Sequence, residues 1–97
     1  MDIIKEIGLS AVLEQLAEEC AELGHAALKL ARIIRGENPT PKTRAEAEAM
    51  LQEESTDVLL CLRLLIRSGL IGEDEGQRWA KKLRWMKRIE ESREESE

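Results

Sequence analysis

The chain has 97 residues, with 15 basic and 20 acidic side chains, and a formal net charge of −5. This length allows one domain at most, residues 1–97. An acidic chain is a poor candidate for binding nucleic acid or an anionic membrane surface. The two tryptophans are its only aromatic residues, which also disfavours a platform for stacking bases.

Ala, Leu, Glu, Lys and Arg dominate the composition, which is typical of helices, and we expect an all-α bundle. Cys20 and Cys61 fall inside apolar helical stripes, so we expect them to be free, buried thiols. The N-terminal residues lack the pattern of a signal peptide. The longest apolar run, residues 58–66, is too short to cross a bilayer and contains Arg63. These features favour a cytoplasmic protein.

The first long helix is predicted from Ser10, as the N-cap, to about Arg35, with Gly36 ending it. A short extra turn over residues 1–7 is expected to precede it and to pack Ile3, Ile4 and Ile7. An alternating three- and four-residue spacing marks the apolar seam of a bundle helix. The predicted seam consists of Leu13, Leu16, Cys20, Leu23, Ala27, Leu30 and Ile34.

Residues 37–42, with two prolines and an Asn, predict a loop. Thr43 and Glu46 fit a capping box that opens the second long helix, which should run to about Ser68 before Gly69. Residues 59–66 are apolar on nearly every side, which predicts a central, buried helix. The apolar side chains of this segment are Leu59, Leu60, Leu62, Leu64, Leu65 and Ile66.

The acidic residues 73–75 favour a third helix start, because negative charge is stabilised at a helix N-terminus. Apolar residues recur along this helix at Trp79, Leu83, Met86 and Ile89. The charged tail, about residues 90–97, is expected to fray. A small core and surplus apolar surface favour an oligomer, either a homodimer or a homotetramer, with four-helix layers made between subunits.

The second helix carries the most informative side chains. Glu54 and Asp57 are one turn apart and lie within its apolar stripe, next to residues such as Val58 and Cys61. Removing two acids from water costs several kcal/mol per ion unless something compensates. Three compensations are possible: a cation, basic side chains or the uptake of protons.

Glu19 and Glu22 form a second pair, one turn apart on the first helix, and are expected to flank its seam. If the two helices pack antiparallel, four carboxylates can converge. Oxygen-only ligands suit hard cations, with Mg²⁺ first and Mn²⁺ second. Zinc is a poor candidate because the single histidine, His25, projects away from the seam.

Residues 18–22, E-E-C-A-E, followed by residues 54–57, E-S-T-D, resemble the E-E-x-x-E … E-x-x-D signature of the MazG-like all-α nucleoside triphosphate pyrophosphohydrolases. The resemblance covers residues 10–66. It implies Mg²⁺-dependent cleavage of a nucleoside triphosphate to the monophosphate and pyrophosphate. By position, the implied metal ligands are Glu19, Glu22, Glu54 and Asp57. Glu18 matches the accessory acid that orients or activates water.

Relatives of this kind carry a K-x-x-x-N-x-x-R-like element late in the chain. Here Lys81, Trp85 and Arg88 stand at those offsets, with Trp in place of the Asn, and they are the candidates for binding substrate. Basic residues on the first or third helix could also face the phosphates, across a subunit boundary.

Two other functions stay open at this stage. The acids could belong to an internal salt-bridge network with Arg63 or Lys29, in a non-catalytic oligomerisation or adaptor module. Alternatively, the same fold could act on phosphoribosyl-ATP. The base and sugar preference, the number of metal ions and the subunit count do not follow from the sequence.

Overall fold

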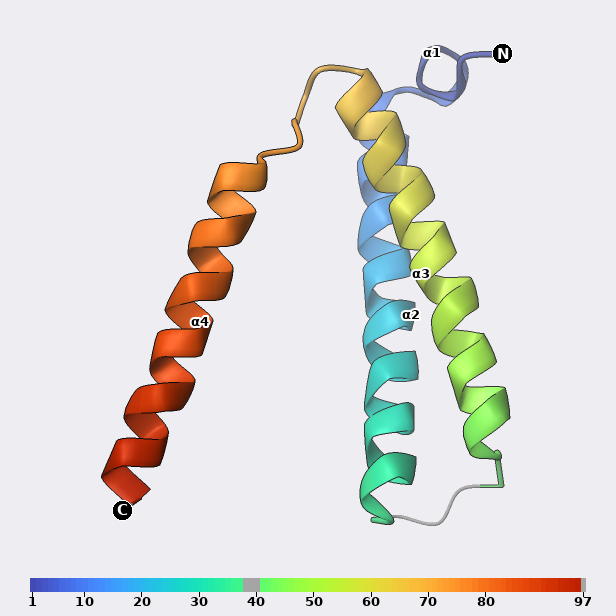
Figure 1. Ribbon diagram of the computed structural model, residues 1–97. Helices are drawn as coiled ribbons and strands as arrows, with labels where there is room; N and C mark the ends of the chain where they lie inside the picture. Colours follow the sequence, from blue (N-terminus) through green and yellow to red (C-terminus); the bar gives the residue numbers. More distant parts are fainter. Residues whose placement is uncertain (38–40, 97) are drawn as a thin grey trace.

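The computed structural model describes residues 1–37 and 41–96, and Figure 1 shows that these form helices joined by short connections. The helices are α1 (Ile3–Ile7), α2 (Leu9–Arg35), α3 (Arg44–Arg67) and α4 (Glu75–Ser96). The all-α fold is therefore confirmed for the described residues. Asn38, Pro39 and Thr40 of the predicted loop lie outside them. None of the described helices is long and apolar enough to cross a membrane.

Local sequence signals explain where most helices begin and end. The Asp2 carboxylate accepts hydrogen bonds from the backbone N–H groups of Ile4 and Lys5 and so starts α1. Gly36 adopts a left-handed conformation, with φ of 69°, and ends α2 as predicted. The prediction of Ser10 as an N-cap is wrong, because α2 already begins at Leu9. Gly8, with φ of 93°, makes the sharp turn between α1 and α2 that fixes this start.

The capping box of α3 is confirmed. Thr43 Oγ1 accepts a hydrogen bond from the Glu46 backbone N–H at 3.2 Å, and Glu46 Oε1 accepts one from the Thr43 N–H at 3.4 Å. At the start of α4, the Asp74 carboxylate accepts from the Gln77 N–H at 2.8 Å. The prediction that the tail frays is wrong for residues 90–96, which continue α4 as far as Ser96. Glu is a good helix former, and four of the residues 90–96 are Glu.

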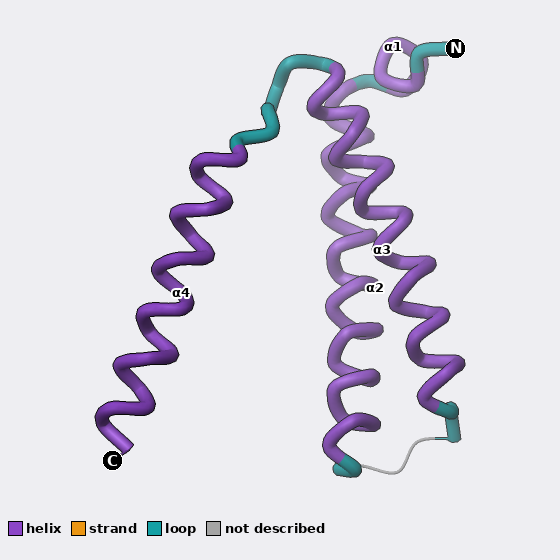
Figure 2. The backbone as a smooth tube through the Cα atoms, viewed as in Figure 1, coloured by secondary structure: helices purple, strands orange, loops and turns teal. Residues whose placement is uncertain are grey.

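The core lies between α2 and α3, which run antiparallel as a hairpin (Figure 2). Its buried side chains all come from these two helices: Val12, Ala26, Ala47, Val58, Cys61 and Leu65. α1 packs against α2 and leaves Ile3 and Ile7 exposed, with only Ile4 half-buried. The core is thin, as expected for a chain of this size.

The predicted seam of α2 is only half right. Leu16, Leu23 and Leu30 do face α3, but Val12, Glu19, Ala26 and Ile33 take the remaining inward positions. The predicted positions Leu13, Cys20, Ala27 and Ile34 are exposed. The two seams have the same spacing and differ by one residue at every second position. Both neighbours are apolar at three of these positions, so the sequence does not distinguish the two seams there. At the fourth, choosing the apolar neighbour placed Cys20, rather than Glu19, inside.

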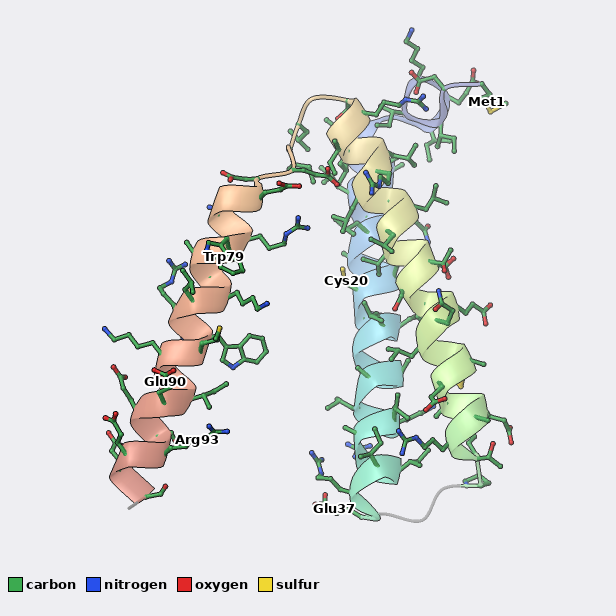
Figure 3. All side chains as sticks on the ribbon, in the orientation of Figure 1. Met1, Cys20, Glu37, Trp79, Glu90 and Arg93 are labelled. Carbon is green, nitrogen blue, oxygen red and sulfur yellow. The ribbon has the colours of Figure 1, made fainter. Side chains whose placement is uncertain are left out.

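Two further expectations about burial are wrong for the single chain. Cys20 is exposed, and Figure 3 shows its sulfur at the surface of α2, whereas Cys61 is buried as predicted. Leu59 and Leu60 are 55% and 56% exposed, so α3 is not enclosed on all sides. A hairpin of two helices can cover only one face of each, which leaves the outer apolar residues without neighbours.

α4 stands apart from the hairpin, at the end of the connection formed by residues 68–74 (Figures 1 and 2). It contributes no buried residue. The Cα radius of gyration is 17.7 Å, whereas a compact chain of this length would have roughly 12–13 Å. The chain is therefore an antiparallel hairpin with an extended helical arm.

The capping box gives the first testable prediction. Replacing Thr43 with Ala removes the side-chain acceptor for the Glu46 N–H, and we expect the free energy of unfolding to fall by about 1 kcal/mol. Thr56→Ala is the matched control. Thr56 lies mid-helix, and its hydroxyl bonds only to Gln52 of its own helix: it donates to the Gln52 carbonyl at 2.9 Å and accepts from Gln52 Nε2 at 3.4 Å. Urea unfolding of both variants measures the difference, and equal stabilities would contradict the capping role.

Candidate metal centre

The acidic pairs predicted on two helices meet across the hairpin. Glu19 and Glu22 lie on α2, while Glu54 lies on α3. One carboxylate oxygen from each of these three residues can be chosen so that all lie within 4.8 Å of one another. The antiparallel packing that the sequence predicted therefore brings three of the four predicted ligands together.

Asp57 and Glu18 occupy different places around this group. Asp57 is half-buried, one turn after Glu54, and lies close enough to interact with Glu19, although it is outside the group of three. Glu18 is exposed on α2 and also lies outside the group. Asp57 thus borders the cluster, and Glu18 points toward solvent beside it.

The inward position of Glu54 follows from helical spacing. Ala47, Val58, Cys61 and Leu65 form the buried face of α3, and Glu54 continues their three-, four- and seven-residue spacing. Glu19 likewise lies seven residues from both Val12 and Ala26, the two buried residues of α2. Each helix therefore turns a carboxylate toward the other at a position where an apolar side chain would be expected.

Hydrogen bonding satisfies only part of this arrangement. Gln15, one turn before Glu19, donates from Nε2 to Glu19 Oε1 at 2.6 Å. Among the side chains of residues 1–37 and 41–96, the two oxygens shielded from solvent without a hydrogen-bond partner are Glu19 Oε2 and Glu54 Oε2. Both belong to the cluster. Unpartnered shielded oxygens are costly, so the site lacks a donor or a cation.

The sequence analysis missed Gln15. Its signal was present, since a Gln four residues before a Glu on a helix can reach that carboxylate. The hydrogen bond holds Glu19 Oε1 and leaves Oε2 facing the other acids.

The cluster perturbs its own ionisation. For Glu19, the Gln15 hydrogen bond lowers the pKa, but desolvation and the charges of Glu22 and Asp57 outweigh it and raise the pKa above its ordinary value of 4.5. For Glu54, desolvation raises the pKa most, followed by interaction with Glu22. Desolvation also raises the pKa of the Cys61 thiol, with smaller contributions from Glu19 and Asp57. Negative charge is therefore disfavoured here without a counterion.

Basic side chains do not neutralise the cluster within the described part of the chain. Arg63, the expected partner in a salt-bridge network, pairs instead with Glu73 at 3.1 Å, in the connection to α4. The other ion pairs among residues 1–37 and 41–96 do not involve the four acids either. Lys29, the second expected partner, takes part in none of them. Of the three compensations considered from the sequence, a cation and proton uptake remain.

The candidate substrate residues are not part of this site in the single chain. Lys81, Trp85 and Arg88 line a shallow groove on the surface of α4, which stands apart from α2 and α3 (Figure 1). His25 is exposed, as expected. Within one chain, the acids therefore lie on the hairpin, whereas the candidate substrate residues lie on α4, apart from them.

The raised pKa values predict how stability depends on pH in the absence of divalent ions. Because the folded state holds protons on Glu19 and Glu54 at a pH where the unfolded chain has released them, the free energy of unfolding should fall as pH rises from 4.5 through the raised values. Glu54→Gln should make this decline shallower and stabilise the chain at pH 7.

Urea unfolding at a series of pH values, with EDTA present, measures this dependence. Glu53→Gln is the matched control, since Glu53 is the exposed neighbour of Glu54 and should leave the slope unchanged. If the free energy of unfolding of Glu54→Gln depended on pH as steeply as that of the parent, the shielded Glu54 carboxylate would not destabilise the folded state.

Comparison with protein-family models, curated proteins and solved structures finds no match to this chain. The features that point to a function are therefore the four carboxylates, their spacing in the sequence and their surroundings in the hairpin.

Proposed function

We propose that the chain is a Mg²⁺-dependent nucleoside triphosphate pyrophosphohydrolase of the MazG-like type, releasing a nucleoside monophosphate and pyrophosphate. The observation that carries the proposal is the group of three carboxylates within 4.8 Å, two of which hold a shielded oxygen without a partner. Three of the signature residues that suggested this family, Glu19, Glu22 and Glu54, form the group. Mn²⁺ is the second candidate ion.

The spacing of the oxygens suits Mg²⁺. Two oxygens on opposite sides of an octahedral Mg²⁺ are about 4.2 Å apart, given bond lengths of about 2.1 Å. Oxygens that lie within 4.8 Å of one another need only small side-chain rotations to reach such positions. Glu19, Glu22 and Glu54 are proposed as ligands, with Asp57 completing the set from the edge of the cluster.

When bound, the metal would supply positive charge for the phosphate oxygens and a more acidic water. The carboxylates hold that charge at a fixed place in an otherwise acidic chain, to which a polyanionic triphosphate would not bind unaided. Glu18, exposed beside Glu19, is proposed to accept a proton from the attacking water. Gln15 keeps the Glu19 carboxylate oriented through its hydrogen bond.

Binding of the substrate phosphates calls for cations that the hairpin does not supply near its acids. Lys81 and Arg88, with Trp85 for the base, are proposed to reach the triphosphate from another subunit of a homodimer or homotetramer. This activity fits a cytoplasmic housekeeping role, in which unwanted nucleoside triphosphates are removed from the nucleotide pool. Phosphoribosyl-ATP would meet the same metal requirement and stays an alternative substrate.

One observation favours a second candidate, the non-catalytic oligomerisation or adaptor module. α4 exposes apolar side chains along its length, including Trp79 at 57% and Trp85 at 64%, and helices of this kind bind partner helices. In that case the acids would remain protonated or bind a cation without turnover.

Activity distinguishes these functions. With Mg²⁺ and a panel of canonical and modified nucleoside triphosphates and phosphoribosyl-ATP, we expect release of pyrophosphate rather than orthophosphate. Glu54→Gln and Glu22→Gln should each lower kcat/KM by about a hundredfold or more, the effect of losing about 3 kcal/mol of transition-state stabilisation. The readout is product identity by chromatography.

Glu53→Gln again serves as control and should keep the parent activity. Circular dichroism of each variant checks that helicity is retained. No pyrophosphate from any member of the panel, or full activity in Glu54→Gln, would remove the enzymatic proposal and leave the adaptor module.

A further inference from the structure

The arm formed by α4 presents an unpartnered apolar surface, which we call the α4 stripe: Trp79, Leu83, Met86 and Ile89. Their side chains are 45–57% exposed, and α4 has no buried residue. Figure 3 shows Trp79 on a helix that stands clear of the hairpin. Large apolar side chains gathered on one exposed face mark an interaction surface.

The charges on α4 are separated along its length. Residues 78–88 contain six basic side chains and no acid, whereas residues 90–95 contain four glutamates and Arg93. A second α4 lying antiparallel would set residues 78–82, with three of the six basic side chains, beside the mainly acidic residues 90–94 of its partner. The other three, Arg84, Lys87 and Arg88, would lie at the level of the same segment of the partner. A parallel arrangement would set basic beside basic and acidic beside acidic, which is unfavourable. The helix is therefore complementary to a reversed copy of itself, as the interface of a two-fold dimer requires.

One register satisfies both the charges and the stripe. If the two-fold axis passes near Met86, Leu83 of one helix lies at the level of Ile89 of the other, and the segment 78–82 lies at the level of 90–94. Lys82 Nζ already lies 5.5 Å from the centre of the Trp79 ring on the same helix, which covers one edge of the stripe and leaves the rest open.

We propose that the α4 stripe is the interface with α4 of a second copy of this chain, with the two helices antiparallel and their midpoint near Met86. The proposal is independent of the metal centre, because it rests on α4 alone. It would also account for the apolar side chains that α4 leaves uncovered.

The mass of the full chain in solution tests the interface. Leu83→Glu places a charge within the stripe and should weaken self-association at least tenfold, so that the mass measured by analytical ultracentrifugation falls by half at the same concentration. Gln77→Glu adds the same charge on the opposite side of α4, by the helical spacing of 100° per residue, and should keep the parent mass. Because α4 has no buried residue, both variants should keep the parent helicity.

A distance between spin labels tests the orientation. With Cys20 and Cys61 replaced by Ala and a label at Glu95→Cys, an antiparallel pair about Met86 separates the labels by about 27 Å along the helices, from a rise of about 1.5 Å per residue. A parallel pair would bring them to about 10 Å, the distance between packed helix axes. Double electron–electron resonance measures the distance between the labels in the assembled protein.

The proposal requires both results, loss of association in Leu83→Glu and a label distance near 27 Å. An unchanged mass in Leu83→Glu would overturn it. So would a label distance near 10 Å, or the absence of any defined distance, as would follow if α4 docked on the hairpin of another copy in several places.

Discussion

The structure depends on a carboxylate at an inward position of each of two packed helices. Glu19 and Glu54 occupy places in the heptad-like seams of α2 and α3 where apolar residues would give a tighter core. Each holds one oxygen that is shielded and without a hydrogen-bond partner. Carboxylates that repel one another and have lost part of their hydration therefore lie between the two helices. A hard divalent cation is the simplest ligand that would relieve this repulsion and make use of it.

The rest of the hairpin offers these acids little compensation. The core around the acids is thin and built from small or medium-sized residues such as Val12, Ala26 and Ala47. The acids have no basic partner within the described chain, and Arg63, the partner expected from the sequence, pairs with Glu73 instead. Positive charge is concentrated on α4, which stands apart. In the proposed function, a second subunit would bring these basic side chains to the acids.

Much of this could be predicted from sequence because short-range rules apply to it. Helix boundaries followed from Thr43, Gly36 and the acidic turn before α4, and Glu54 was placed correctly since its apolar neighbours repeat at helical spacing. The inward seam of α2 was misplaced by one residue at every second position, and at Cys20 this error hid an acid. A rule that puts apolar residues inside fails where an acid is turned inward, and Glu19 is such a case. The exposure of α4 could not be predicted from the sequence either. Apolar residues at helical spacing look the same whether they pack into the core of their own chain or against another chain.

The proposal that the acids bind a divalent cation is tested most directly by thermal unfolding of the full chain with EDTA, with MgCl₂ or MnCl₂, and with NaCl at matched ionic strength. Binding to the folded state alone stabilises it by about 2.7 kcal/mol at a hundredfold excess of metal over Kd, so Tm should rise by several degrees. Glu54→Gln should abolish that rise. A Tm that responds to Mg²⁺ and Mn²⁺ no more than to NaCl would contradict the account.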